Sequence, residues 1–461
     1  MSTVAAIRPK PHYPPGPVSH PVTGMAREFQ RAPLPTLCRL HNQYGHAVRF
    51  RFFGPFYGYL FTHPEHYQHI LQTNNPNYTK MPHPTFIIME PLAGKGLLTN
   101  DGESWLRQRR LAQPAFHRKQ IADFAAVMTD CAAAMLDRWA QQWPVNPRLD
   151  VDKAMMALTL QIVGQTLFSL DLTAEARRVG EAFTEINRSI ADLSVQPFSI
   201  YTVRLPFWPS TRRYRRQVAI LDEVINRIIA ERRAQPPTQA DLLGMLMAAR
   251  DEATGAGMDD KQLRDEVGTL LVAGHETTAN LLTWAFSALD ANPAVRHKLL
   301  AELDAVLGGR IPTVADVPNL PYTRLVLDET LRLYPPAYAM ARWGNAPDRV
   351  GDYDIPANAA ITLTVFYTHR SPDFWENPLV FDPERFTPER SADRPKLAYL
   401  PFGAGPRQCI GKDFALLEAT LLLAMIAQRF ELQVAPGHLV ELDPQITLRP
   451  KNGLPVILRP R

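Results

Sequence analysis

Residues 402–411 read Phe-Gly-Ala-Gly-Pro-Arg-Gln-Cys-Ile-Gly, and this loop gives the chain its clearest chemical character. Three glycines within ten residues allow backbone conformations that side chains forbid, so a bulky planar group can lie against the main chain. An apolar run from Phe414 to Ile426 follows, long and dense enough to form a buried helix. Cys409 therefore lies near a helix N-terminus, where amide dipoles stabilise a thiolate. The neighbouring glycines leave the sulfur room to be ligated, and Arg407 offers a cation to an acidic ligand group, so we expect a metal ligand.

A lone cysteine is more often a small buried hydrophobic residue than a ligand. Here the pattern Phe-x-x-Gly-x-Arg-x-Cys-x-Gly resembles the haem-binding loop of the cytochrome P450 family. It is matched at Phe402, Gly405, Arg407, Cys409 and Gly411. The resemblance implies haem b (iron protoporphyrin IX), with its iron held by the Cys409 thiolate, whose electron donation favours O–O cleavage. It also implies that Phe402 and Gly403 contact the cofactor.

Length and composition are those of a large folded protein: 461 residues, 46% of them hydrophobic. No linker-like stretch divides the chain, so we expect one domain over residues 1–461 with a Pro-rich, extended N-terminus at residues 1–24. Helical patterns cover residues 102–112, 120–143, 151–169, 174–192, 212–234, 259–292, 294–307 and 321–333, and strand patterns 47–52, 57–62, 354–364, 446–448 and 456–458. The prediction is a mainly α protein with a minor β part (α+β). The resemblance implies the cytochrome P450 fold, with haem between the long central helix and the cysteine loop.

Cysteine count and charge exclude some classes of protein. Cys38, Cys131 and Cys409 are odd in number and far apart, which argues against a disulfide framework, and we interpret the first two as core thiols. A net charge of +4 is slight for this length and gives no reason to expect nucleic acid as a partner. The N-terminus has no apolar run of signal or membrane length, so we expect no membrane anchor and a cytoplasmic protein of the soluble bacterial type.

The predicted helix at 259–292 carries Ala273-Gly274-His275-Glu276-Thr277 in its middle. Ala273 and Gly274 give a flat patch that a large ligand can touch, and Thr277 can bond back to the Ala273 carbonyl and bend the helix. We expect Glu276 and Thr277 to face a groove, although a mid-helix threonine usually makes only such a back-bond. The pentad matches the P450 family's Ala/Gly-Gly-x-Asp/Glu-Thr motif. The resemblance implies that Thr277 holds dioxygen, that Glu276 relays protons from solvent, and that His275 is structural or solvent-facing.

Two charged residues of the helix at 321–333, Glu329 and Arg332, share one helical face. Most such pairs decorate the surface and contribute little to stability. Together with Arg385 in Asp-Pro-Glu-Arg-Phe, however, they resemble the family's Glu-x-x-Arg helix and its partner arginine. The resemblance implies a buried charge cluster with a structural role.

Haem also carries two propionates, which need cations or hydrogen-bond donors. Trp105 and Arg109 match the family's Trp-x-x-x-Arg pattern, and Arg342 matches the arginine on the strand after the Glu-x-x-Arg helix. With Arg407, these are the propionate contacts that the resemblance implies, and His369 resembles a further position near the haem edge. Without the resemblance, a buried indole and solvated cations would be the simpler interpretation.

The substrate pocket is predicted from positions that line it in relatives. They are Phe86, Ile87, Ala339, Met340 and Ile446. Nearly all are apolar, which favours an apolar small molecule such as a fatty acid, a terpenoid or a steroid-like compound. The chain contains no flavin, nicotinamide or iron-sulfur motif, so electrons must come from another protein, by resemblance a ferredoxin or a flavodoxin.

These features predict a cytochrome P450 monooxygenase, an oxidoreductase acting on paired donors that inserts one atom of O2 into its substrate by hydroxylation or epoxidation. A haem-thiolate peroxygenase using H2O2 is one alternative, but such enzymes usually lack the acid-alcohol pair present here. A non-catalytic haem-based sensor or carrier is another. A cysteine hydrolase with Cys409 as nucleophile is disfavoured because no histidine is placed by a motif to activate it.

Overall fold

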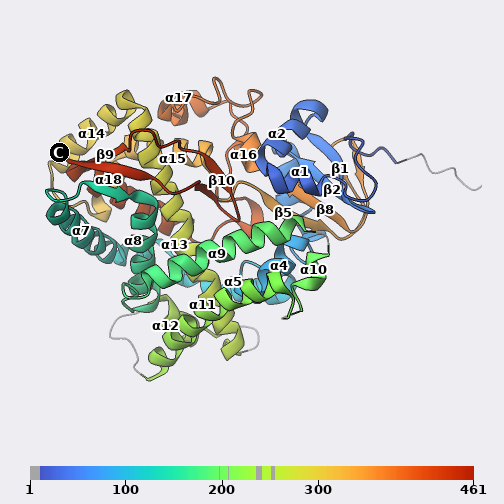
Figure 1. Cartoon of the computed structure of the whole chain (residues 1–461), viewed down its shortest axis with the longest axis horizontal. Helices are drawn as coiled ribbons and strands as arrows, with labels where there is room; N and C mark the ends of the chain where they lie inside the picture. The colour runs from blue at the N-terminus through green and yellow to red at the C-terminus, as the bar shows by residue number, and fades with distance from the viewer. Residues whose placement is uncertain (1–10, 197, 206, 235–240, 251–254) are drawn as a thin grey trace, which may run out of the picture.

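The computed structural model describes residues 11–196, 198–205, 207–234, 241–250 and 255–461. Helices make up most of it, and the strands lie both beside the N-terminal, blue part of the chain and along the C-terminal, red part (Figure 1). The α-helices are α1 (Ala26–Arg31), α2 (Pro33–Tyr44), α3 (Pro64–Gln68), α4 (Pro84–Ala93), α5 (Gly102–Ala112), α6 (Arg118–Asp123), α7 (Ala125–Gln142), α8 (Val151–Phe168), α9 (Ala176–Val195), α10 (Ser199–Thr202), α11 (Pro209–Ala234), α12 (Leu242–Ala248), α13 (Asp260–Ala291), α14 (Pro293–Leu307), α15 (Pro321–Leu333), α16 (Val365–Thr368), α17 (Pro388–Ser391) and α18 (Lys412–Arg429). The prediction of a mainly α protein with a minor β part is confirmed.

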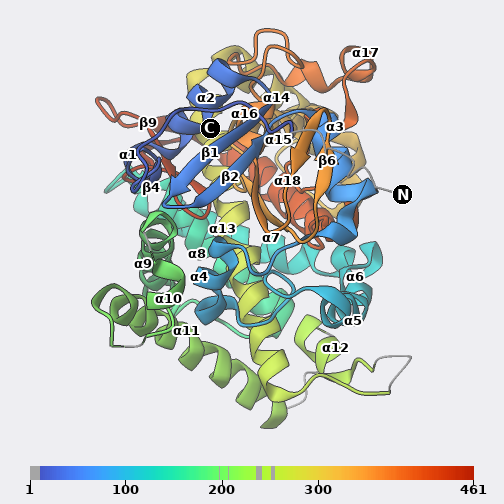
Figure 2. The same ribbon diagram turned by 90° about the vertical axis from the view of Figure 1, so that its right-hand side faces the viewer.

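The strands form four sheets among the described residues. They are β1 (Ala47–Phe53), β2 (Phe56–Phe61), β3 (Tyr78–Thr79), β4 (Arg148–Asp150), β5 (Met340–Gly344), β6 (Asp348–Val350), β7 (Tyr353–Ile355), β8 (Ala359–Leu363), β9 (Phe430–Val434), β10 (Leu442–Pro444), β11 (Leu448–Pro450) and β12 (Pro455–Pro460). The largest sheet has the order β1-β2-β8-β5-β3, and the others are β4-β12-β9, β10-β11 and β6-β7. Figure 2 shows β1 and β2 at one end of the molecule and α11 and α12 at the other.

Helix α13 is the central element, and it runs through the middle of the molecule (Figure 1). The Asp259 side chain accepts a hydrogen bond of 2.7 Å from the Gln262 N–H and so caps the first turn. Pro293 ends the helix because a proline disfavours helical backbone in the residue before it. Neighbours on several sides, among them α4, α8, α11, α15 and α18, hold α13 in place. The motif in its middle therefore lies on a rigid support.

Most predicted elements occur within about three residues of the predicted bounds, and the exceptions have local causes. The expected helix at 120–143 is broken at Phe124, whose N–H bonds to the Ile121 carbonyl at the end of α6 before α7 begins. The expected strand at 354–364 is two strands, β7 and β8, separated by a turn with Asn358 at φ +61°. The strand patterns around Gly453 do not pair with each other, because β11 pairs with β10 whereas β12 pairs with β4 and β9.

The N-terminal segment follows the sheet. Residues 1–10 of the predicted extended N-terminus lie outside the described residues. From residue 11 to residue 24 the chain forms no helix, and the Pro15 carbonyl accepts a 2.9 Å hydrogen bond from the Arg49 N–H of β1.

Of the two thiols expected in the core, Cys131 is buried and Cys38 is half-buried. Within the described part of the chain, no helix is both long and apolar enough to cross a bilayer.

Candidate functional site

The cysteine loop closes on itself. The Cys409 N–H donates to the Phe402 carbonyl at 2.9 Å, and the chain then enters α18. Gly403 and Gly405 have φ values of +68° and +70°, which favour glycine. A Cβ on Gly405 would lie 1.9 Å from the Leu71 carbonyl oxygen, so close packing requires this glycine, and the prediction that it makes room for the sulfur is wrong.

Gly411 differs from the other two glycines of the loop. A Cβ there would meet only Phe116, at 4.0 Å, so neither sterics nor a positive φ requires glycine at this position. The Gly411 N–H instead bonds to the Cys409 sulfur and lowers the pKa of its thiol. Desolvation by the surrounding protein raises that pKa more strongly, although Cys409 retains accessible surface, while Arg109 and Lys412 act in the same direction as the amide.

Cys409 and the middle of α13 both keep accessible surface. The Cys409 side chain is exposed, unlike Cys131. On α13, Ala273 is exposed although Val272 is buried on one side and His275 on the other. The Thr277 hydroxyl donates to the Ala273 carbonyl at 2.8 Å, which confirms the predicted back-bond. Gly274 is half-buried, and a Cβ there would meet Val163 at 3.1 Å, so its small size serves packing against α8.

Glu276 does not share a groove with Thr277, contrary to the prediction. Its side chain is buried, and its Oε1 accepts hydrogen bonds from Asn187 of α9 and, at 2.7 Å, from the Thr447 hydroxyl. Consecutive helical residues point about 100° apart, so the two side chains face different neighbours. Burial raises the pKa of Glu276, and Arg449 together with the two donors opposes this shift.

Arg449 extends the network around Glu276. Its guanidinium pairs with Asp152 of α8 at 3.1 Å and donates to Thr184 of α9 at 3.3 Å. Neither Asn187 nor Thr447 was predicted as a partner of the acid, since each comes from a distant part of the sequence. His275 is also buried, with Nδ1 2.6 Å from the Leu271 carbonyl oxygen, so its structural interpretation holds and the solvent-facing one is wrong.

A group of buried basic side chains lies around Arg342. This guanidinium is 5% exposed, its Nη1 donates to the Ala341 carbonyl at 2.8 Å, and its Nε has no hydrogen-bond partner. Burial lowers its pKa to about 10. Lys80 and His83, which the sequence did not reveal, are also buried nearby. Burial, with a smaller contribution from Arg342, lowers the pKa of Lys80 and lowers that of His83 to about 4, so the His83 ring is neutral at pH 7. The buried Arg342 guanidinium with its unused Nε donor indicates an anion-binding site.

Arg407 and Arg109 are already engaged with the protein. Arg407 pairs with Asp101, donates to the Asn100 carbonyl at 2.7 Å, and lies 3.6 Å from the ring centroid of the buried Trp105. Burial lowers the pKa of Arg407 to about 10. Arg109 donates to the Gln408 carbonyl at 3.1 Å, directly beside the cysteine. The structure thus brings all four predicted propionate contacts, Trp105, Arg109, Arg342 and Arg407, to the region of the loop. Among the three arginines, Arg342 is the one with a buried Nε that lacks a hydrogen-bond partner.

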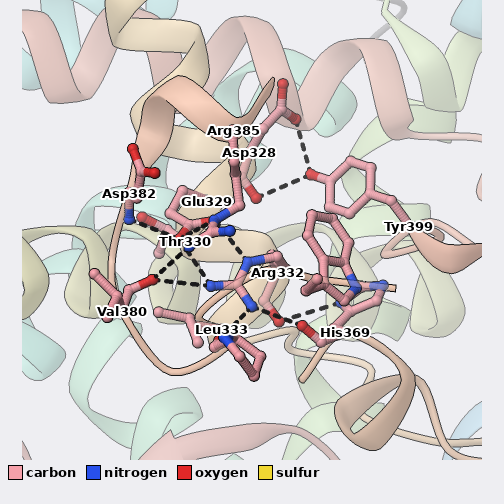
Figure 3. Close-up of polar contacts among 12 residues, drawn as sticks. Asp328, Glu329, Thr330, Arg332, Leu333, His369, Val380, Asp382, Arg385 and Tyr399 are labelled. Carbon is pink, nitrogen blue, oxygen red and sulfur yellow. Dashed lines mark hydrogen bonds and ion pairs between the residues drawn. The ribbon is translucent and has the colours of Figure 1, made fainter. Parts of the chain in front are cut away.

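The predicted charge cluster is assembled as Figure 3 shows. Glu329 accepts from Arg332 at 2.6 and 2.8 Å and from the Arg385 Nε at 3.1 Å, and none of the three side chains is more than 3% exposed. Arg332 also donates to the His369 and Pro378 carbonyls, each at 2.7 Å. His369 is itself part of this packing, since its Nε2 accepts from the Leu400 N–H at 3.0 Å.

The predicted pocket residues come from three separate parts of the fold. Phe86 and Ile87 are buried on α4, which packs against α9 and α13. Met340 begins β5, Ala339 directly precedes it, and Ile446 precedes β11; these three are half-buried. Ile446 packs against the same hydrophobic cluster as Phe86 and Ile87, whereas Met340 packs against a second cluster built around the largest sheet.

Comparison with known proteins decides the family. The family profile described as Cytochrome P450 matches residues 14–455. The chain belongs to the cytochrome P450 family. Among its relatives, a protein of Streptomyces melanosporofaciens named "Cyclooctatin synthase" is 37% identical over 430 residues, covering 93% of this chain and 92% of the relative. Another from that organism, "Cyclooctat-9-en-7-ol 5-monooxygenase", is 36% identical over 422 residues, covering 91% and 90%. A solved structure, "Crystal structure of cytochrome P450DA heme domain", superposes with a TM-score of 0.87 at 27% identity, covering 98% of each chain.

This P450 is accordingly a haem-dependent monooxygenase with the predicted P450 fold, which uses O2 and electrons delivered by a partner. The residues present fit haem on observations of this chain. An exposed sulfur at Cys409 can ligate iron, the exposed Ala273 offers a small flat contact, and the unpartnered Nε of buried Arg342 suits a carboxylate.

Replacing Arg342 with leucine should weaken haem retention. The variant removes the least satisfied buried cation, and we expect haem to leave about tenfold faster or more, because a propionate would lose a desolvated charge partner. The measurement is haem transfer to an excess of a haem-scavenging globin. Arg370→Leu is the control, since Arg370 bonds to the Phe366 and Leu333 carbonyls and stacks on Phe366. Equal loss rates in both variants would contradict a propionate contact at Arg342.

Proposed function

We propose that this P450 oxidises a terpenoid-like hydrocarbon skeleton, with Cys409 as the iron ligand and a ferredoxin or flavodoxin as electron donor. The observation that carries the proposal is the accessible surface at Cys409 and at Ala273 and Thr277, since the neighbouring Val272, Glu276 and Thr278 of α13 are buried. When bound, haem supplies the activation of dioxygen, and a thiolate ligand favours O–O cleavage.

Thr277 and Glu276 are the groups that we assign to proton handling. The Thr277 hydroxyl donates its hydrogen bond to the Ala273 carbonyl. The lone pairs of the hydroxyl oxygen therefore remain free to accept a hydrogen bond from the accessible side. Both donors to Glu276 bind Oε1, so Oε2 is the atom that can carry and release a proton. Because burial raises its pKa, Glu276 holds a proton at a higher pH than an exposed carboxyl does. Arg449 and Asp152 extend this network toward α8.

Glu276→Gln should lower product formation by about 10², the usual contribution of a general acid, while leaving the fold intact. The amide oxygen can still accept from Asn187 and Thr447, so only the titratable proton is lost. The measurement is product formed per NADPH consumed. Glu266→Gln is the matched control, because Glu266 is also buried on α13 but accepts from the Leu97 N–H. If both variants formed the same amount of product per NADPH consumed, Glu276 would not take part in proton delivery.

The substrate class is inferred from the pocket and the relatives. Phe86 and Ile87 are buried and apolar, and Ala339, Met340 and Ile446 add apolar surface. One relative is named as a monooxygenase of cyclooctat-9-en-7-ol. The endings -en and -ol in that name denote a carbon–carbon double bond and an alcohol. A cyclic, mostly apolar terpenoid alcohol or alkene therefore suits this P450 better than a fatty acid or a steroid-like molecule.

The electron donor is inferred from charge and shape beside the cysteine loop. Arg118 is 86% exposed in its side chain, and Lys412 begins α18 directly after the loop. A groove of about 430 Å³ lies alongside, lined by Arg118, Arg324, Asp413 and apolar residues including Leu416 and Leu417. Asp413 pairs with Arg118 at 3.2 Å, so the rim carries a modest excess of positive charge. A rim of this sign around an apolar floor is complementary to an acidic ferredoxin or flavodoxin.

One assay tests the substrate and the donor together. The haem-loaded protein is titrated with cyclic terpenoid alcohols, fatty acids and steroids, and the spectral change on loss of axial water is recorded. Binding compounds are then supplied with O2 and reduced ferredoxin or flavodoxin, or with H2O2 alone. We expect terpenoids to bind at least about tenfold tighter than fatty acids and to be hydroxylated or epoxidised. Turnover with H2O2 alone would support the peroxygenase instead, and binding without product under any donor would support a sensor or carrier.

A further inference from the structure

Imidazoles and a carboxylate gather where α2, the start of β1 and the segment after α16 meet. His41 lies in the last turn of α2, His46 directly precedes β1, and Asp373 follows α16. One potential ligand atom from each lies within 4.8 Å of the other two. His63 adds a further imidazole, with its ring centroid 4.9 Å from that of His46. Neither the predicted haem site nor the predicted pocket includes these residues.

Hydrogen bonds show that these side chains have lone pairs available. The Nδ1 atoms of His41 and His46 both lie 2.8 Å from the hydroxyl oxygen of Thr62. That hydroxyl oxygen has two lone pairs, so it can accept from the Nδ1–H of both imidazoles. In this arrangement each imidazole carries its free lone pair on Nε2. The His46 Nε2 lies 3.2 Å from the Asp373 Oδ2, and this carboxylate is held by the Ser371 hydroxyl at 2.7 Å.

The surroundings hold the imidazoles in place. The His41 ring centroid lies 3.8 Å from that of Tyr367, and the His46 centroid 5.8 Å from that of Phe374. Imidazoles whose Nδ1 positions are fixed by a neighbouring hydroxyl are typical of metal-ligating histidines.

We propose that His41, His46 and Asp373 bind a divalent transition-metal cation of the Zn²⁺ type. Two imidazole nitrogens and one carboxylate oxygen, with water in the fourth position, are a ligand set that Zn²⁺ accepts. Donor atoms around tetrahedral Zn²⁺ lie about 3.3 Å apart, so the three side chains must close by ~1 Å or more. Asp373 can move, since its side chain is 51% exposed. The bound cation cross-links α2 and β1 to the segment that leads toward Arg385 and the cysteine loop.

The test is titration of chelator-treated, haem-loaded protein with ZnCl2 by isothermal calorimetry at pH 7.5. Haem loading keeps Cys409 occupied, and an unchanged haem absorption spectrum checks this. We expect one event near 1:1 stoichiometry with a Kd of about 1 μM or tighter. His46→Gln and Asp373→Asn should each weaken it about tenfold or more. His69→Gln is the matched control, because His69 pairs with Asp348 at 2.7 Å and is not a member of the His41, His46 and Asp373 cluster, and the variant should bind Zn²⁺ as the parent does.

Two results would overturn the proposal: no 1:1 event in the parent protein, or an event of equal affinity in the parent and in both His46→Gln and Asp373→Asn. The first would show that the cluster is a hydrogen-bonded network only, and the second that Zn²⁺ binds elsewhere. Should either variant lose haem or fold poorly, His41→Gln replaces it, and the same tenfold loss is required.

Discussion

Glu329→Ala will yield little folded, haem-containing protein. The substitution leaves Arg332 and Arg385 buried without their carboxylate partner, and Asp382 loses the acceptor of its N–H at 2.8 Å. Breaking a buried ion pair by removing one partner costs about 3–5 kcal/mol, because the remaining charge is uncompensated. That is a large share of the stability of a typical protein. The measurements are the yield of holoprotein and the free energy of unfolding in urea.

A half-exposed pair on the same helix provides the control. Arg324 and Asp328 of α15 form an i,i+4 pair at 2.8 Å, and the Arg324 side chain is 45% exposed. The buried Asp328 keeps a second donor, the Tyr399 hydroxyl at 2.8 Å, when Arg324 is replaced. Arg324→Ala should therefore lower the free energy of unfolding by less than about 1 kcal/mol. If Glu329→Ala and Arg324→Ala destabilised the protein equally, the buried cluster would not hold the core as we describe.

The sequence predicted the long helix more fully than it predicted the charge cluster. Periodicity alone placed Glu329 and Arg332 on one helical face, which usually means a surface pair, and only the family resemblance added Arg385. The long helix was predicted to within one residue at each end from its residue pattern, and the structure adds that the Asp259 cap and the following Pro293 fix those ends. Where local features agree in this way, single-sequence reasoning succeeds.

Partners that are distant in the sequence could not be predicted. The acid at Glu276 is bonded by residues 89 and 171 positions away, Asn187 and Thr447, and nothing in the pentad indicates them. That Glu276 turns away from the side that Thr277 faces follows from its burial and these two partners, not from the pentad. Lys80 and His83 lie in a short segment without periodicity, so their burial beside Arg342 emerges only from the fold.

Cys409→Ser is the other substitution with a large expected effect. A serine hydroxyl holds its proton far more tightly than a thiol, so it provides neither a thiolate nor its electron donation to iron. We expect product formation to fall by about 10³-fold or more, equivalent to ~4 kcal/mol in the activation barrier. The fold should survive, because the Cys409 side chain is exposed and its N–H bond to Phe402 involves only backbone. Circular dichroism and gel filtration check this.

The other two cysteines are matched controls for that substitution. Cys131 is buried and donates to Gln165 at 3.3 Å, and Cys38 is half-buried on α2. Cys131→Ser and Cys38→Ser replace a sulfur atom with oxygen, as Cys409→Ser does. We expect both variants to keep the parent haem spectrum and turnover, at some cost in stability for Cys131→Ser.

The central claim, that haem iron is bound through Cys409, is tested most directly by the absorption spectrum of the reduced, carbon monoxide-bound protein. We predict a thiolate-type band in the parent protein and in Cys131→Ser, and its loss in Cys409→Ser loaded with haem. A thiolate-type band that persists in Cys409→Ser, or a histidine-type spectrum in the parent protein, would contradict the claim.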